Sequence, residues 1–159
     1  MVRKNLGKAT LWWLAAYWSA RYAGVPLSIV LALTLDLPGS ELGTHLLESP
    51  AYLATQPYHP LLNMVAFLPA AYFFMRGRVS PTSGTFLPEA LKLGVFWAGL
   101  SAAYDLVSWV IIPTPVQFTF RQFYVDYQPW LTLIYAVIFL SPLLAAAVMS
   151  IRPAQRTTA

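Results

Sequence analysis

Four long apolar stretches leave this chain few ways to fold. They cover about residues 10–35, 57–75, 93–112 and 130–151. Each is close to the ~20 residues that an α-helix needs to cross a hydrocarbon core about 30 Å thick. The remainder of a 159-residue chain is too short to form a separate soluble domain. The sequence therefore predicts a single all-α membrane domain over residues 1–159, built as a bundle of four transmembrane helices.

The composition agrees with a lipid environment. Hydrophobic residues make up 58% of the chain and charged residues 10%, whereas soluble domains carry about 25% charged residues. The chain has no cysteine, which excludes disulfide scaffolds and thiol catalysis. The net charge of +4 comes from bases that adjoin the apolar stretches rather than from a basic patch among exposed aromatics. Nucleic acid is therefore not expected as a partner.

The charges between the stretches predict the orientation. One side carries eight bases and a single acid, Glu89, and the other carries four acids and a single base, Arg121. Because basic loops stay in the cytoplasm, both termini are expected on the cytoplasmic side, as in a multi-pass protein of a prokaryotic cytoplasmic membrane. The bases on that side are Arg3, Lys4, Lys8, Arg76, Arg78, Lys92, Arg152 and Arg156.

The segment between the first and second stretches is expected to be structured. Residues 41–48 combine helical spacing with an apolar face, which predicts a short helix lying in the membrane interface. Ser49-Pro50 is typical of an N-cap followed by proline in the first helical turn. Pro57 and Pro60 predict that the second span has a bent entry and begins late.

Two features indicate how the bundle meets lipid. Aromatic residues stand at the ends of several stretches, as in an interfacial belt. The fourth stretch, 130–151, carries no charge, so we expect it to be the most lipid-facing helix, with a kink at Ser141-Pro142. The belt residues are Trp12, Trp13, Tyr58, Tyr124, Tyr127 and Trp130.

Two charges lie inside the stretches at matched depths. At 1.5 Å per residue from the cytoplasmic edge, Arg21 is about 15 Å into the first span and Asp105 about 18 Å into the third. An ionisable residue inside a span costs several kcal/mol unless it is paired or hydrated. Because both spans run from the cytoplasm outwards, we expect Arg21 and Asp105 to form an ion pair near the membrane midplane.

Polar and small residues accompany the pair. Small residues on the first span (Ala16, Ala20, Gly24) and on the third (Gly94, Ala98, Ala102) predict that the two backbones approach closely. Two interpretations of the polar residues stay open: a staple that fixes helix register, or the polar floor of a cavity that takes a substrate headgroup, an ion or a proton. The candidate floor comprises Arg21, Asp105, Tyr17, Tyr22, Ser101, Tyr104 and Asn63, with Tyr135 also within reach.

The external segments contain two further candidate groups. Glu41, His45 and Glu48 share one helical face at a spacing that suits zinc or acid–base chemistry. A polar face on an interfacial helix explains the same spacing, and we expect no metal and no cofactor. Arg121 and Asp126 lie in an aromatic segment, either a lid or contact surface or, as we prefer, an ordered loop in which they pair.

Without a recognisable catalytic constellation, the sequence favours binding over catalysis. The first hypothesis is a subunit or accessory partner of a membrane complex or homo-oligomer, or a binder of an amphipathic small molecule. The alternative is a small membrane enzyme or carrier for a lipid-like substrate that uses the Arg21/Asp105 floor. A lipid-sized pocket beside Arg21 would favour a ligand, and a dry, packed bundle would favour the subunit.

Overall fold

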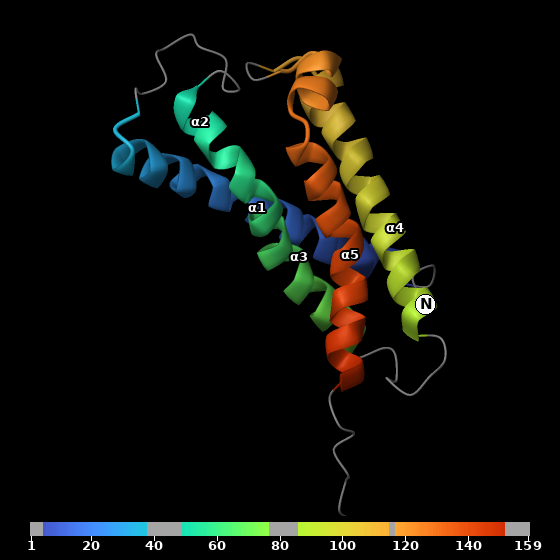
Figure 1. The fold of residues 1–159 in the computed structure, drawn as a ribbon. Coiled ribbons are helices and arrows are strands. Elements are labelled where there is room, and N and C mark those ends of the chain that lie inside the picture. The colour runs from blue at the N-terminus through green and yellow to red at the C-terminus, as the bar shows by residue number, and fades with distance from the viewer. Residues whose placement is uncertain (1–4, 38–48, 77–85, 115–116, 152–159) are drawn as a thin grey trace, which may run out of the picture.

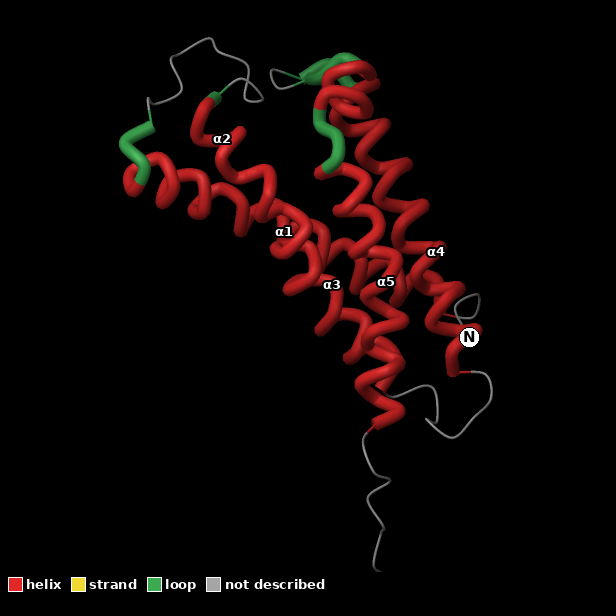
Figure 2. The backbone as a smooth tube through the Cα atoms, viewed as in Figure 1, coloured by secondary structure: helices red, strands yellow, loops and turns green. Residues whose placement is uncertain are grey.

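The computed structural model describes residues 5–37, 49–76, 86–114 and 117–151, and within these ranges the chain is helical and has no strand (Figures 1 and 2). Short 3₁₀ or π-helical pieces extend or join the longer helices: η3 (Gln56–Tyr58), η4 (Leu106–Ile111) and η5 (Gln122–Asp126). The α-helices are α1 (Leu6–Thr34), α2 (Pro50–Thr55), α3 (His59–Arg76), α4 (Phe86–Asp105) and α5 (Trp130–Ile151).

Helix α5 is the centre of the arrangement. It packs between α3 on one side and α4 on the other (Figure 1). Helix α1 contacts both α3 and α2. The expectation that α5 is the most lipid-facing helix is wrong, because α5 contacts two neighbours along its length. An uncharged sequence suits a helix packed on two sides as well as one that faces lipid. Its buried residues are Leu131, Ile134, Ile138, Ser141, Pro142, Ala145, Ala146 and Met149.

Two glycines of α1 and α4 do not make the close contact that was predicted between these two helices. A Cβ atom added to Gly94 on α4 would lie 2.4 Å from the carbonyl oxygen of Phe139, so the close backbone approach is to α5. The atom nearest to a Cβ added to Gly24 on α1 is His59 Nε2, at 3.8 Å. The prediction is therefore wrong for these two glycines, since periodicity identifies a face but not the helix that covers it.

Helix α1 belongs to the bundle for only part of its length. All of its buried residues come before Arg21, and beyond that point the helix inclines away from α4 and α5 (Figure 1). It ends where Asp36 takes a left-handed conformation with φ of 49°, which aspartate tolerates better than most residues. The Leu37 amide then donates to the carbonyl of Ala32 at 3.0 Å, the closing bond of a Schellman turn.

The entry to the second predicted span departs from α-helical geometry at its prolines. Helix α2 has Pro50 in its first turn directly after Ser49, although the serine side chain forms no capping hydrogen bond. Pro57 lies in the 3₁₀ turn η3, and α3 begins only at His59. The α-helix α3 itself therefore begins two residues later than the predicted span, but the helical path is continuous from Pro50 through η3.

Helix α4 begins earlier than the sequence predicts and changes geometry after its acid. It starts at Phe86 and includes Glu89 and Lys92, whose side chains form an ion pair at 3.0 Å. The apolar criterion missed this first part because the two charges interrupt it. After Asp105 the chain continues as the π-helix η4, a form that often occurs at functional sites.

Among the described residues, two helical segments are long and apolar enough to cross a membrane. They are Phe86–Ile111, which joins α4 to η4, and Trp130–Ile151, which is α5. Only 22% and 39% of their most apolar windows are buried within the chain, whereas the core helix of a soluble protein is mostly buried. These helices support membrane association.

Candidate functional site

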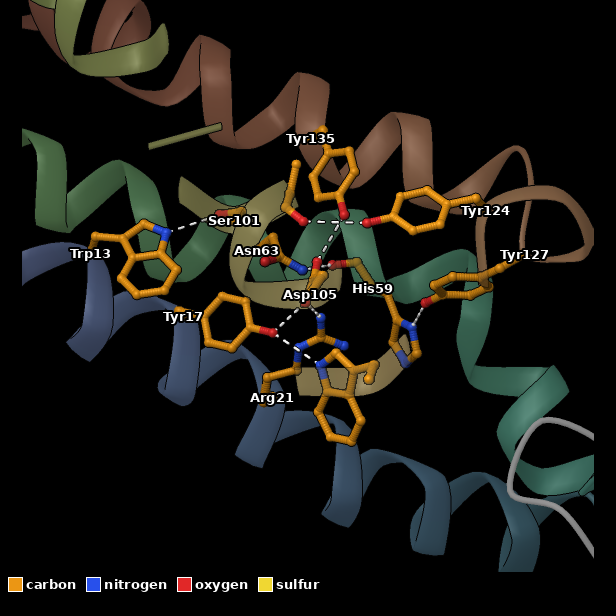
Figure 3. Close-up of polar contacts among 12 residues, drawn as sticks. Trp13, Tyr17, Arg21, His59, Asn63, Ser101, Asp105, Tyr124, Tyr127 and Tyr135 are labelled. Atoms are coloured by element: carbon orange, nitrogen blue, oxygen red, sulfur yellow. Dashed lines mark hydrogen bonds and ion pairs between the residues drawn. The ribbon is translucent and has the colours of Figure 1, made fainter. Parts of the chain in front are cut away.

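The centre of the site is the ion pair that the matched depths predict. Arg21 Nη2 lies 2.7 Å from Asp105 Oδ1, which joins α1 to the end of α4 (Figure 3). The side chain of Asp105 is 1% exposed and that of Arg21 is 28% exposed. The carboxylate is therefore enclosed, whereas part of the Arg21 side chain stays accessible.

Two tyrosine hydroxyls donate further hydrogen bonds to Asp105. The Tyr17 hydroxyl donates to Oδ1, and the Tyr135 hydroxyl on α5 donates to Oδ2 at 2.9 Å. Trp109 in η4 donates its Nε1 hydrogen to the Tyr17 hydroxyl at 3.2 Å. Buried charges are tolerated when they are paired and hydrogen-bonded. Asp105 meets this condition with donors from α1 and α5.

Aromatic rings hold the guanidinium in place. Arg21 Cζ lies 4.9 Å from the ring centroid of Tyr17 and 5.6 Å from that of Trp109, within the range of cation–π attraction. A guanidinium has five N–H donors, and the bond to Asp105 occupies one nitrogen. Arg21 therefore keeps donor capacity on its accessible side.

That accessible side faces a cavity of about 650 Å³. The cavity lies between the outer half of α1, α2 and the start of α3 on one side, and Trp109 with the 118–134 segment on the other. Its volume falls within the ~300–1,000 Å³ of small-molecule sites. The polar side chains in its lining include Arg21, His59, Asn63, Ser28 and Ser49, and most of the remaining lining is aliphatic or aromatic.

A histidine–tyrosine group beside the cavity was not predicted. His59 Nδ1 and the Tyr127 hydroxyl are hydrogen-bonded (Figure 3). The ring of Tyr52 packs against both, with centroids 5.5 Å from His59 and 6.4 Å from Tyr127. Burial raises the pKa of Tyr52 and of Tyr127, so both hydroxyls keep their protons at neutral pH.

The candidate floor divides into cavity-lining and supporting residues. Arg21, Tyr22 and Asn63 line the cavity, and the Asn63 amide also donates to the carbonyl of His59 at 2.8 Å. Behind the floor, Ser101 Oγ accepts a 2.9 Å hydrogen bond from Trp13 Nε1, both within the core.

Two more of the predicted residues support the floor. Tyr104 packs edge-on against Tyr17 at 5.0 Å between centroids, and Tyr17 itself holds Asp105. Tyr104 and Tyr17 therefore hold Asp105 in position and do not line the cavity. Trp109 was missed, although it follows Asp105 by one helical turn and this spacing is a usable signal.

The two external candidate groups differ in outcome. Arg121 Nε lies 3.7 Å from Asp126 Oδ1, and both side chains are exposed, which confirms the predicted pairing. The segment is not the expected loop, because Arg121 caps the π-helix η5 and Asp126 ends it. Glu41, His45 and Glu48 lie outside the described residues. Within the described ranges, no group of three or more His, Cys, Asp or Glu residues is placed to hold a metal ion.

Comparisons with protein-family models, curated proteins and solved structures gave no match for this chain. The function is therefore argued from the geometry of the site.

Proposed function

We propose that this chain is a four-span membrane protein, with both termini cytoplasmic, that binds an amphipathic, lipid-like ligand in the cavity beside Arg21. The cavity itself carries the proposal: about 650 Å³ of largely apolar space with a guanidinium on its inner wall. A bundle that only docks to other subunits needs no such space. Binding without catalysis accounts for the arrangement.

The exposed apolar surface supports four spans rather than two. Large apolar side chains are exposed on every long helix, for example Leu14 on α1, Val65 on α3, Val95 on α4 and Leu140 on α5. Soluble monomers rarely expose contiguous apolar patches larger than a few hundred Å². Lipid around all four helices gives these side chains an apolar environment.

The ion pair supports a ligand site at membrane depth. Enclosure strengthens the attraction between two charges but also removes them from water at a cost, and a pair that serves only as a staple does not require that one partner line a cavity. Here Asp105 is enclosed but the Arg21 side chain is 28% exposed, towards the cavity. The arrangement suits an arginine that is held by Asp105 on one side and offers hydrogen-bond donors to a ligand in the cavity on the other side.

Native mass spectrometry of protein extracted gently from its own membrane tests the proposal. Wild-type protein should leave with a bound amphiphile. Ala32→Trp, which fills the cavity from α1, should lose that mass, whereas Ala103→Trp, the same change at an exposed position of α4, should retain it. Release with a protein partner and no small molecule, or equal occupancy in both variants, would contradict ligand binding.

A further inference from the structure

We propose that the ligand carries an uncharged, flat, carbonyl-bearing ring on an apolar tail, the chemistry of membrane quinones. This inference rests on the proposed function, because it identifies the ligand class of the same cavity. Three properties of the lining carry it: the charge balance at the floor, the hydrogen-bonding character of the polar groups, and the shape of the walls.

The charge balance favours an uncharged headgroup. Among the described residues that line the cavity, Arg21 is the one with a fixed charge, and Asp105 already compensates it at 2.7 Å. An anionic headgroup would add a charge at membrane depth without a counter-ion of its own, which is costly in a low-dielectric environment. A cationic headgroup would face the guanidinium directly.

Arg21 and the His59 imidazole offer donors in the cavity, so the headgroup should present acceptors to them, while Asn63, Ser28 and Ser49 in the same lining can both donate and accept. Arg21 has donors only, and one of its nitrogens is engaged by Asp105. His59 Nδ1 is hydrogen-bonded to the Tyr127 hydroxyl, and we infer that Tyr127 is the donor in this bond. The imidazole hydrogen then lies on Nε2, the nitrogen that faces Gly24 at the cavity. Carbonyl oxygens match a guanidinium and an imidazole N–H.

The walls near the floor suit a flat ring. Trp109 and Phe118 lie 6.2 Å apart between centroids with an interplanar angle of 32°, and Phe118 and Phe123 lie 5.9 Å apart at 24°. These three rings pack on one another, and they line the cavity together with Tyr52 and His59. Aromatic faces favour offset stacking with a planar ring, which a saturated chain cannot provide.

The opposite end of the cavity suits the tail. From Arg21 to Leu33 the cavity follows α1 for about 18 Å at 1.5 Å per residue. Val25, Ile29 and Leu33 line this part and are exposed, so the cavity opens there. The outer half of α1 inclines away from α4 and α5, which directs an apolar tail sideways out of the bundle (Figure 1).

Quenching of tryptophan fluorescence tests the ligand class, because Trp18 and Trp109 line the cavity. The full chain in lipid nanodiscs is titrated with decyl-benzoquinone, with palmitate and hexadecanol as competing amphiphiles. Saturable quenching is expected with wild-type protein, with little competition from palmitate. His59→Phe removes the donor but keeps a ring, and should weaken quinone binding about tenfold, as expected for one hydrogen bond of ~1.4 kcal/mol.

Two further variants separate the possible results. His59→Gln, which retains an N–H donor, should recover part of the affinity, and Tyr58→Phe at the neighbouring exposed position should bind like wild type. Saturable binding of palmitate or hexadecanol that is lost in Ala32→Trp, without saturable quinone quenching, would overturn the headgroup class but leave the proposed function intact. If no amphiphile binds saturably, both proposals fail. Equal quinone affinity in His59→Phe and wild type would also overturn this inference.

Discussion

Three side chains donate hydrogen bonds to the single carboxylate of Asp105. Arg21, Tyr17 and Tyr135 all donate to it, from two different helices. Removal of one donor therefore has a different effect from removal of the carboxylate. Without Arg21, an anion remains with two hydroxyl donors; without Asp105, a guanidinium and two hydroxyls all lose their acceptor.

Arg21→Leu and Asp105→Leu should each destabilise the protein by about 3–5 kcal/mol, because each leaves a charge unpaired at depth. The double variant should cost at least ~2 kcal/mol less than the sum of the two, since no lone charge remains. It should not recover fully, because Tyr17 and Tyr135 still lose their acceptor, at about 1 kcal/mol each. The free energy of unfolding in detergent or bicelles measures all three variants.

The exposed pair provides the control for this cycle. Arg121→Leu, which breaks the contact with Asp126 at 3.7 Å, should change the free energy of unfolding by no more than about 1 kcal/mol. Additive single effects at Arg21 and Asp105 would show that the two charges are not energetically coupled.

The ion pair was predictable from the sequence, whereas the histidine–tyrosine group was not. A constant rise per residue converts a position in a helix into a depth, so Arg21 and Asp105 could be matched without coordinates. Tyr127 follows the π-helix η5 and lies in the turn before α5. No simple period relates sequence to position there, and the direction of the Tyr127 side chain depends on packing alone.

The contact between α4 and α5 depends on the absence of a side chain at one position. A Cβ atom at Gly94 would lie 2.4 Å from the carbonyl oxygen of Phe139, which is backbone and cannot rotate away. Gly94→Ala should therefore push the two helices apart and destabilise the protein by about 1–3 kcal/mol. The free energy of unfolding measures the change.

Gly99 is the matched control on the same helix. A Cβ atom there meets nothing within 4 Å, so Gly99→Ala should be neutral or stabilise by up to about 1 kcal/mol through helix propensity. An equal loss of stability in the two variants would mean that general effects of glycine replacement in α4, rather than the contact with Phe139, determine the result.

The sequence predicted individual helices better than their neighbours. The fourth apolar stretch agrees with α5 at both ends, because few charges or turn residues interrupt it. The start of α4 was missed by several residues, since Glu89 and Lys92 pair with each other inside the helix. Assignment of α5 as the outermost helix failed because an apolar residue packs against lipid and against another helix by the same physical forces.

The proposed four-span topology predicts where along the chain a cytoplasmic reporter will be active. A reporter that is active only in the cytoplasm should work when fused after Arg78 or Arg156 and be silent when inserted at Glu48 or Gln122. The proposed orientation follows from the bases beside the apolar stretches. Activity at both Arg78 and Glu48 would mean that α3 does not cross the membrane.

Because the cavity opens sideways along α1, detergent molecules would compete with a ligand for the cavity when the protein is solubilised. Detergents are themselves amphiphiles, and at millimolar concentration even one with millimolar affinity would fill half of the sites. The exposed residues Val25, Ile29 and Leu33 at the opening are the first that a detergent tail meets. If the cavity binds a ligand as proposed, a protein purified in detergent would lose that ligand, because detergent molecules would replace it in the cavity.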